Sequence, residues 1–228
     1  MIMNKDVIYA IEYSALGSLD RFNLLLVAAG LRPSAILGLY SRTFIKSEEP
    51  RSVLERDIDE TIEAIEQAGL VYETKTEIVE RNPNEEHPEL SRYRESVTIC
   101  VAKDQEMLNK LVSALAIPWT PDTKVEKDLA LGTTLGYPET AVKAFIEGRK
   151  KFTWDLPIMV QLEEPAQFVY MALSDDHWQD ELKTIYGWAE AVKEMAPEVY
   201  FDVRNSPGNI DKTLAEKVRA RIAELEAK

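Results

Sequence analysis

Hydrophobic residues recur at helical spacing in three segments of the first half of the chain, residues 18–31, 50–69 and 103–116. In the second segment they stand three or four residues apart, at Leu54, Ile58, Ile62 and Ile65. This spacing places them on one face of an amphipathic helix. Gly30 and Gly69 stand near the ends of the first two segments, and glycine ends helices readily because it adopts the left-handed conformation without strain. The three segments are therefore predicted to be helices.

Two neighbouring segments, residues 70–80 and 92–102, alternate between apolar and polar side chains instead. Alternation with a period of two is typical of a strand that has one face in the core and one in water. The residues between them, 81–90, are rich in proline, asparagine and glutamate, which indicates an exposed hairpin loop. We predict an antiparallel pair of strands. The apolar segment 35–45 fits either a strand or a short helix.

The second half contains a long helical pattern between short apolar segments. Residues 174–196 carry apolar side chains spaced four, three, four and three residues apart, at Trp178, Leu182, Ile185, Ala189 and Val192. Short apolar runs at residues 156–162, 167–173 and 198–204 resemble buried strands, and residues 210–228 form a charged amphipathic pattern. A strand–helix–strand–helix order of this kind could form a right-handed parallel crossover at the C-terminal end. The predicted fold class is α+β, with a mixed sheet and amphipathic helices.

Two prolines in residues 117–124 interrupt any regular structure and mark the best internal boundary. They suggest an N-terminal α+β half, residues 1–117, and a C-terminal α/β half, residues 118–228. One compact domain remains an alternative, because 228 residues suit either arrangement.

Charge and cysteine content narrow the class of protein. The net charge is −13, which repels phosphate backbones and disfavours nucleic acid as a partner. Cys100 is the single cysteine, so an intramolecular disulfide is impossible; its apolar surroundings predict a buried thiol. No apolar run is long enough to span a membrane, and the N-terminus lacks the pattern of a signal peptide. These features predict a soluble cytoplasmic protein with no membrane partner.

Residues 129–151 form the most informative stretch, because a glycine and a proline stand between two helical patterns. Gly136 would end the first helix and Pro138 would start the second, with Val142 and Phe145 buried beneath the corner. A structural corner explains all of these residues. The free N–H groups at the start of the second helix could also bind an anion, although Glu139 at that position argues against a phosphate. The candidate binding corner comprises Gly136, Tyr137, Pro138, Glu139 and Thr140.

The same stretch also has the spacing of a helix-turn-helix motif over residues 126–148, with Gly132, Gly136 and Val142 at the expected positions. The second helix would present an outer face containing Glu139, Thr140, Lys143 and Glu147. The basic residues 149–151 could contact a DNA backbone, but two glutamates on the reading face oppose phosphates.

Leu135, Gly136, Tyr137 and Pro138 form an "LGYP" sequence followed by the aromatic Phe145. This element resembles one in an uncharacterised, largely archaeal domain family of unknown function, where paired cysteines and an aromatic residue follow it. Thr140 and Ala141 stand where that family has its cysteines, so a thiol, metal or redox role implied by those cysteines cannot operate here. The resemblance therefore implies the turn, and it implies no reaction.

A second candidate site lies at the start of the long helix, where acidic residues and a histidine follow Ser174: Asp175, Asp176, His177, Asp180 and Glu181. His177 and Glu181 are four residues apart, so they would share a helix face and could hold Mg²⁺ or another divalent cation with a third ligand. The structural alternative is that Ser174 caps the helix and that acidic residues are favoured at its positive end. His87, the other histidine, lies in the predicted hairpin loop.

The chain contains neither the GxxxxGK[ST] nor the GxGxxG phosphate-binding loop. Because catalytic and cofactor motifs are not recognisable, the leading hypothesis is a non-enzymatic binding or interaction protein for a small molecule or a protein partner, and a homo-oligomer is compatible with it. The first alternative is a hydrolase- or transferase-like enzyme that uses carboxylates and His177, with or without a divalent cation. The second alternative is a DNA-binding regulator built on residues 129–151.

Overall fold

The structure is a computed structural model that describes residues 3–40, 44–45, 51–82, 92–161, 163–205 and 220. The chain divides into two compact units, Met1–Ala116 and Ile117–Lys228. The division falls at the start of the proline-containing segment that suggested a boundary. That the two halves are separate domains stays a prediction.

An antiparallel sheet forms the centre of the N-terminal unit. Strand β4 (Arg92–Ala102) pairs with β1 (Ser34–Tyr40), with β3 (Val71–Asn82) and with the short β2 (Phe44–Ile45). Ile99 of β4 lies opposite Leu37 of β1 and Thr74 of β3. The antiparallel pair predicted from the alternating segments is therefore confirmed, and the ambiguous segment 35–45 supplies β1 and β2. The predicted hairpin loop falls largely outside the described residues, and His87 with it.

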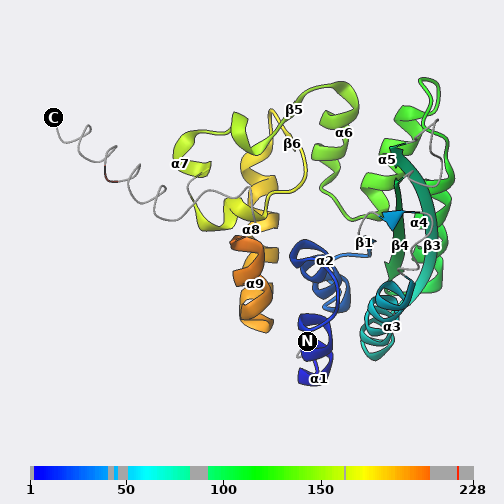
Figure 1. Cartoon of the computed structure of the whole chain (residues 1–228). Helices are drawn as coiled ribbons and strands as arrows, with labels where there is room; N and C mark the ends of the chain where they lie inside the picture. Colours follow the sequence, from blue (N-terminus) through cyan, green and yellow to red (C-terminus); the bar gives the residue numbers. More distant parts are fainter. Residues whose placement is uncertain are drawn as a thin grey trace. The chain divides into compact units, whose positions relative to one another are not determined.

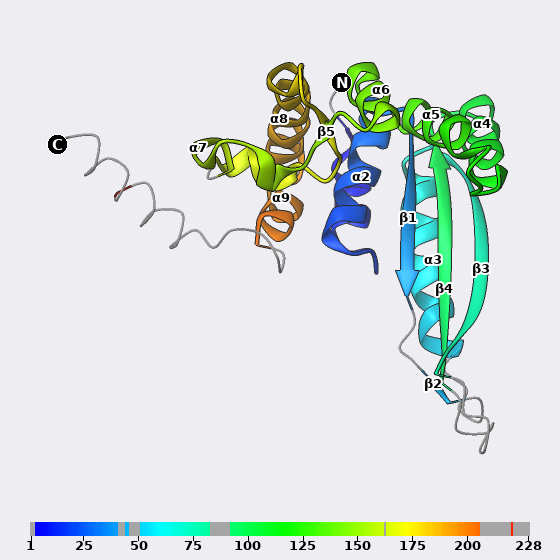
Figure 2. The ribbon, with the colours of Figure 1, turned by 90° about the horizontal axis from the view of Figure 1, so that it is seen from above.

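Helices α2 (Ser18–Ala28), α3 (Arg51–Gln67) and α4 (Gln105–Ala116) pack against this sheet, and α1 (Lys5–Glu12) packs against α2 and α3. In Figure 2, α3 runs along one face of the strands and α2 lies beside β1. Gly30 and Gly69 follow α2 and α3 with φ values of 70° and 68°, so both predicted helix ends are confirmed. Cys100 is buried, and burial together with the charge of Glu73 raises the pKa of its thiol to about 11.

Asp20 joins α2 to the edge of the sheet. Its Oδ2 accepts a hydrogen bond of 3.3 Å from the backbone N–H of Gly38 in β1. Burial disfavours the charged carboxylate and raises the pKa of Asp20 from 3.8 to about 6, although the bond from Gly38 acts in the opposite direction. The folded protein therefore takes up a proton here at a higher pH than the unfolded chain does.

The Asp20→Asn variant should become more stable relative to the wild type as the pH rises from 4 to 7. A raised carboxyl pKa gives stability that is present below the unfolded pKa and is lost as the pH rises through the folded pKa. Asparagine keeps an acceptor for Gly38 and does not titrate. We expect a relative gain of about 1 kcal/mol, less than the full shift in pKa implies because the side chain is partly exposed. Urea unfolding at pH 4 and pH 7 measures it, and a difference that does not change with pH would contradict the assignment.

The C-terminal unit is mainly helical (Figure 1). Its helices are α5 (Lys124–Thr134), α6 (Glu139–Glu147), α7 (Ile158–Gln161), α8 (Trp178–Met195) and α9 (Pro197–Arg204). Two short 3-10 helices cover Thr153–Asp155 and Glu164–Phe168. Strands β5 (Lys150–Lys151) and β6 (Leu173–Ser174) pair antiparallel, and α6 packs against both of them and against α8. The predicted long helix is confirmed as α8.

Three predicted strands of this unit are wrong. Residues 156–162 contain α7, and of residues 167–173 only Leu173 is in a strand. Residues 198–204 lie in α9, where Val199, Tyr200 and Val203 are buried and Phe201 is 57% exposed. Apolar residues at 199, 201 and 203 mimic a strand, but burial follows helical spacing and Pro197 starts the helix.

These helices also remove the basis for a parallel crossover. The described strand pairs are all antiparallel, and the segment expected to return to the sheet is α9. The fold class is α+β, as predicted, but the predicted mixed sheet is wrong, because the described strands pair only antiparallel. Apart from Ala220, the predicted C-terminal helix lies outside the described residues. In the part of the chain that the structure describes, none of the helices has the length and hydrophobicity that a membrane span requires.

Candidate functional site

Helices α5 and α6 meet at a tight corner. The backbone N–H of Tyr137 donates to the carbonyl of Gly132 (3.0 Å), and that of Gly136 donates to the carbonyl of Thr133 (3.1 Å). This pattern is a Schellman motif, and Gly136 supplies its left-handed residue with φ of 73°. Pro138 is the N-cap of α6, which begins at Glu139. The predicted turn is confirmed.

The two helices approach each other closely at Gly132. A Cβ atom at this position would lie only 2.6 Å from Cγ2 of Val142. Val142 is 6% exposed, as expected for a residue under the corner. The missing side chain of Gly132 therefore allows α6 to pack onto α5.

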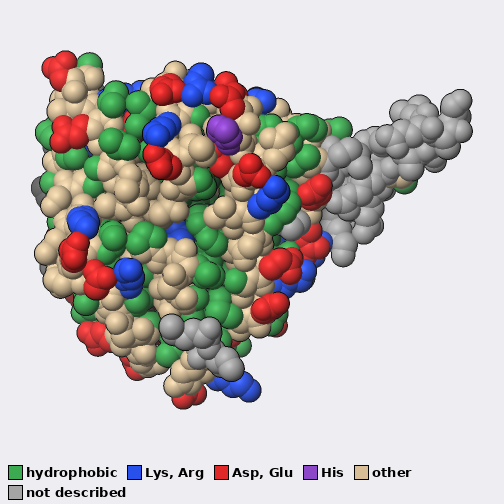
Figure 3. Space-filling model, turned by 180° about the vertical axis from the view of Figure 1, so that it is seen from behind, with side chains coloured by type: hydrophobic (Ala, Val, Ile, Leu, Met, Phe, Trp, Pro, Cys, Tyr) green, Lys and Arg blue, Asp and Glu red, His purple; other side chains and the backbone are tan. Residues whose placement is uncertain are grey.

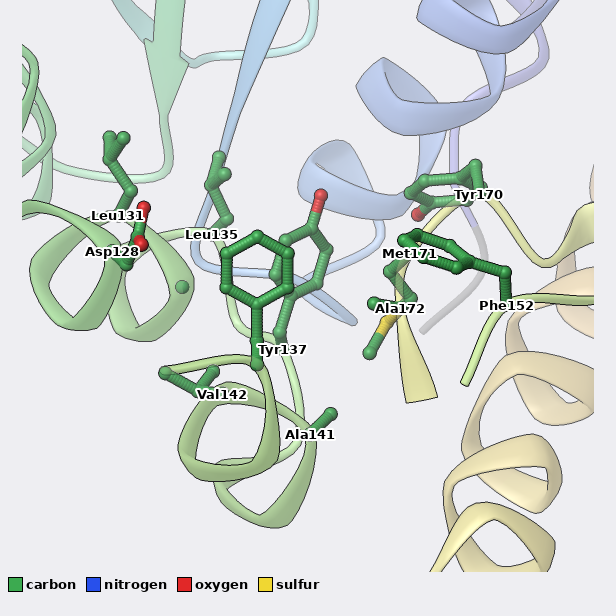
Figure 4. Close-up of a pocket in the computed structure, with 12 residues that line it drawn as sticks. Asp128, Leu131, Leu135, Tyr137, Ala141, Val142, Phe152, Tyr170, Met171 and Ala172 are labelled. Carbon is green, nitrogen blue, oxygen red and sulfur yellow. The ribbon is translucent and has the colours of Figure 1, made fainter. Parts of the chain in front are cut away.

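A pocket of about 350 Å³ lies beside this corner, and all of its walls belong to the C-terminal unit. Helices α5 and α6 form one part of the wall, and residues next to β5 and β6 form the other. Twelve residues line it: Asp128, Leu131, Gly132, Leu135, Tyr137, Ala141, Val142, Phe145, Phe152, Tyr170, Met171 and Ala172. Figure 4 shows the rings of Tyr137, Phe152 and Tyr170 around this space.

The lining is mostly apolar and contains four aromatic rings, those of Tyr137, Phe145, Phe152 and Tyr170. Its volume and its apolar walls are typical of pockets for small organic molecules. Asp128 is the one residue with a formal charge in this lining. The described residues give the Asp128 carboxylate no hydrogen bond and no ion pair.

Lys150 lies against two of the pocket rings without lining the pocket. Its Nζ is 4.0 Å from the centroid of the Phe145 ring and 5.6 Å from that of Phe152. These distances are those of cation–π interactions. Phe152 also stacks on Trp154, with 4.6 Å between ring centroids.

Two tryptophans, Trp119 and Trp154, flank the corner segment in the sequence, and both are exposed. Trp154 is 71% exposed and Trp119 is 66% exposed. Trp154 stacks on Phe152, and the Nζ of Lys127 lies 5.8 Å from the centroid of the Trp119 ring. Trp154 is therefore close enough to the pocket wall to report on it by fluorescence.

The structure brings together two candidate sites that the sequence analysis treated separately. Glu181 of α8 is 2% exposed, and its Oε1 accepts a hydrogen bond of 2.6 Å from the hydroxyl of Thr140 in α6. Its Oε2 accepts a bond of 2.7 Å from the backbone N–H of Ser174 in β6. Glu181 therefore connects α8 to the corner helix and to the β5–β6 pair.

The remaining acidic side chains of the second candidate site point to other partners. Asp175 and Asp176 each accept a hydrogen bond from Arg149, at 2.9 Å and 2.7 Å. Asp180 pairs with Lys183 at 2.6 Å, which lowers the pKa of Asp180.

His177 precedes α8 as its exposed N-cap residue, and its backbone N–H donates to the hydroxyl of Ser174 (2.9 Å). Ser174 thus caps the turn before the helix. Among the described residues, no group of three or more His, Cys, Asp or Glu side chains is placed to hold a metal ion. The divalent cation stays a prediction.

The outer face of α6 carries charges of both signs. Glu139 and Lys143 form an ion pair of 2.6 Å, which lowers the pKa of Glu139 and raises that of Lys143. Arg149, expected to contact a DNA backbone, is bound to acidic side chains instead. On the face drawn in Figure 3, Lys and Arg side chains stand among Asp and Glu without forming a continuous basic patch. None of these observations favours DNA binding, which stays a prediction.

A second hollow, of about 360 Å³, lies between α1 and α3 in the N-terminal unit. Its walls include Tyr9 and Tyr13, whose rings are 4.4 Å apart, and the carboxylates of Asp6, Glu60 and Glu63. Glu60 pairs with Arg56 and Glu63 accepts a bond from Gln67. The walls of this hollow are more polar, so the pocket beside the corner is the better candidate for an apolar ligand.

Sequence reasoning found Tyr137 of the pocket but missed Phe152, Tyr170, Met171 and Asp128. Tyr170 and Met171 stood in a segment interpreted as a buried strand, and Asp128 resembles any polar helix residue. These residues meet only because the β5–β6 pair returns the chain to α6.

Comparisons with protein-family models, curated proteins and solved structures find no match to this chain. The resemblance carried by residues 135–138 therefore stays a prediction.

Proposed function

We propose that this chain is a non-enzymatic binding protein that takes a small, largely apolar organic molecule in the pocket beside the α5–α6 corner. The observation that carries the proposal is the pocket itself, with about 350 Å³ of space and four aromatic rings in its lining. Aromatic and aliphatic walls with few polar groups are typical of small-molecule sites.

The chemistry of the lining supports binding rather than catalysis. Asp128 and the tyrosine hydroxyls are the polar side-chain groups in it. The lining residues include no serine, cysteine, lysine or histidine to act as a nucleophile or to pair with a carboxylate in acid–base chemistry. The carboxylates of the second candidate site, which an enzyme could have used, are bound within the protein instead, by Arg149, Lys183, Thr140 and Ser174.

The proposal predicts that filling the pocket weakens binding. Ala172 lines the pocket, and Ala172→Leu would place three more carbon atoms in or beside it. We expect 2-phenylethanol to bind the wild type with a dissociation constant on the order of 1 mM, a reasonable affinity for so small a molecule. We expect the variant to bind it at least about tenfold more weakly, because apolar area is lost and the space is occupied. Saturation-transfer NMR and calorimetric titration measure both.

Ala116→Leu is the matched control, since Ala116 is an exposed residue at the end of α4. This variant adds the same atoms elsewhere and should bind like the wild type. Circular dichroism checks that both variants are folded. If small aromatic molecules of any charge fail to bind the wild type, or bind Ala172→Leu equally well, the proposed function is wrong.

A further inference from the structure

The pocket lining contains one negatively charged side chain, that of Asp128, among uncharged and mostly apolar residues. Asp128 lies in α5, half-buried, and lines the pocket together with Leu131 of the same helix and Leu135, its C-cap residue. The described residues supply no hydrogen bond or ion pair to its carboxylate. A carboxylate beside apolar walls is stabilised by a positive charge brought into the same space.

The aromatic walls favour the same sign of charge. The faces of aromatic rings are electron-rich and attract cations within about 6 Å of the ring centroid. Two of the pocket rings already attract a cation of the protein itself, since Nζ of Lys150 lies 4.0 Å from the Phe145 centroid and 5.6 Å from that of Phe152. The net charge of −13 also attracts cations to the protein over longer distances.

We propose that the pocket selects an organic ammonium ion, with its apolar body between the aromatic rings and its charged nitrogen at the Asp128 carboxylate. This inference rests on the proposed function and specifies the chemical class of the ligand. Lys150 determines the orientation of the ligand, because its positive charge repels a cation from the Phe145 and Phe152 side. An anionic ligand is disfavoured by Asp128.

Three probes of nearly equal size and shape test the charge: 2-phenylethylammonium, neutral 2-phenylethanol and anionic phenylacetate. At one pH and one ionic strength, we expect the ammonium ion to bind the wild type about tenfold more tightly than the alcohol, since a charge-assisted hydrogen bond is stronger than a neutral one. Phenylacetate should bind most weakly. Calorimetry gives the dissociation constants.

Asp128→Asn should reduce the affinity for the ammonium ion by about tenfold, to that of the alcohol, and leave the affinity for the alcohol within about twofold. Glu126→Gln is the matched control: it removes the same charge from an exposed residue of α5 outside the pocket lining, and it should change neither affinity. Equal binding of the ammonium ion and the alcohol to the wild type would overturn the inference and leave the proposed function intact. An ammonium preference that persists in Asp128→Asn would also overturn it. If none of the probes binds, the proposed function fails and the inference with it.

Discussion

Replacing Glu181 with alanine should lower the free energy of unfolding by about 3 kcal/mol, the largest effect that we expect from a single substitution in this protein. Glu181 accepts hydrogen bonds from the Thr140 hydroxyl and from the backbone N–H of Ser174, and both Ser174 and Glu181 are almost completely buried. Alanine removes both acceptors. A buried donor without an acceptor costs about 1–3 kcal/mol, and the smaller side chain also leaves a cavity.

Urea unfolding of the purified variant measures this loss. Glu190→Ala is the control, since it removes an exposed glutamate of the same helix and should cost less than about 0.5 kcal/mol. Glu181→Gln keeps one acceptor oxygen and should fall between the two. A loss below about 1 kcal/mol for Glu181→Ala would show that Glu181 does not hold α6, β6 and α8 together.

Replacing Gly132 with alanine should cost about 2 kcal/mol, although alanine is the better helix former. The new Cβ would lie 2.6 Å and 3.0 Å from the two γ-carbons of Val142. Real Cβ atoms do not approach other atoms so closely, so α5 and α6 would have to move apart. Overpacking of this kind outweighs the gain of about 1 kcal/mol that alanine brings to a helix interior.

Gly187 in α8 offers a matched control. A Cβ atom built there meets nothing within 4 Å, so Gly187→Ala should stabilise the protein by about 0.5–1 kcal/mol. The opposite signs at two helical glycines separate steric conflict from helix propensity. Val142→Ala should also relieve part of the cost of Gly132→Ala, which a double-mutant cycle detects as a favourable coupling. If Gly132→Ala stabilises the protein as Gly187→Ala does, then the close packing of the corner is wrong.

Both substitutions bear on the pocket as well as on stability. Helix α6 carries the pocket residues Ala141, Val142 and Phe145, and its position depends on the contact with Gly132 and on the bond to Glu181. A variant that shifts this helix moves one wall of the pocket. We therefore expect both to weaken ligand binding even where the protein remains folded.

The sequence predicts the N-terminal unit well because its patterns are long and regular. Eleven alternating residues in each of two segments indicate β3 and β4, and Gly30 and Gly69 locate the ends of α2 and α3. Helix α1 was missed, although Val7 and Ile11 are buried at helical spacing and the Asn4 side chain caps the helix by accepting from the backbone N–H of Asp6.

In the C-terminal unit the apolar segments are too short for periodicity to distinguish a strand from a buried helical turn. Residues 198–204 illustrate this, because apolar side chains at alternate positions predict a strand, whereas the long-range packing of Val199, Tyr200 and Val203 determines a helix. The strand prediction for this segment is wrong because tertiary contacts decide between strand and helix here, and the local sequence pattern does not reveal those contacts.

The candidate site could be predicted only in part for the same reason. The turn at Gly136 follows from local stereochemistry, and the sequence located it correctly. The aromatic wall depends on where the chain returns, since Phe152 and Tyr170 are separated from Tyr137 by 15 and 33 positions. The link between Thr140 and Glu181 spans 41 positions and depends on the packing of α6 against α8.

The central claim is that the pocket beside the α5–α6 corner binds a small organic molecule, and its most direct test is the location of a bound probe. In protein labelled with ¹³C at the methionine methyl groups, 2-phenylethylammonium should give intermolecular NOEs to the methyl group of Met171, which lines the pocket. Met171→Leu identifies that signal, and Ala172→Leu should abolish the NOEs. A bound probe that leaves the Met171 signal unchanged and contacts another methionine would contradict the account.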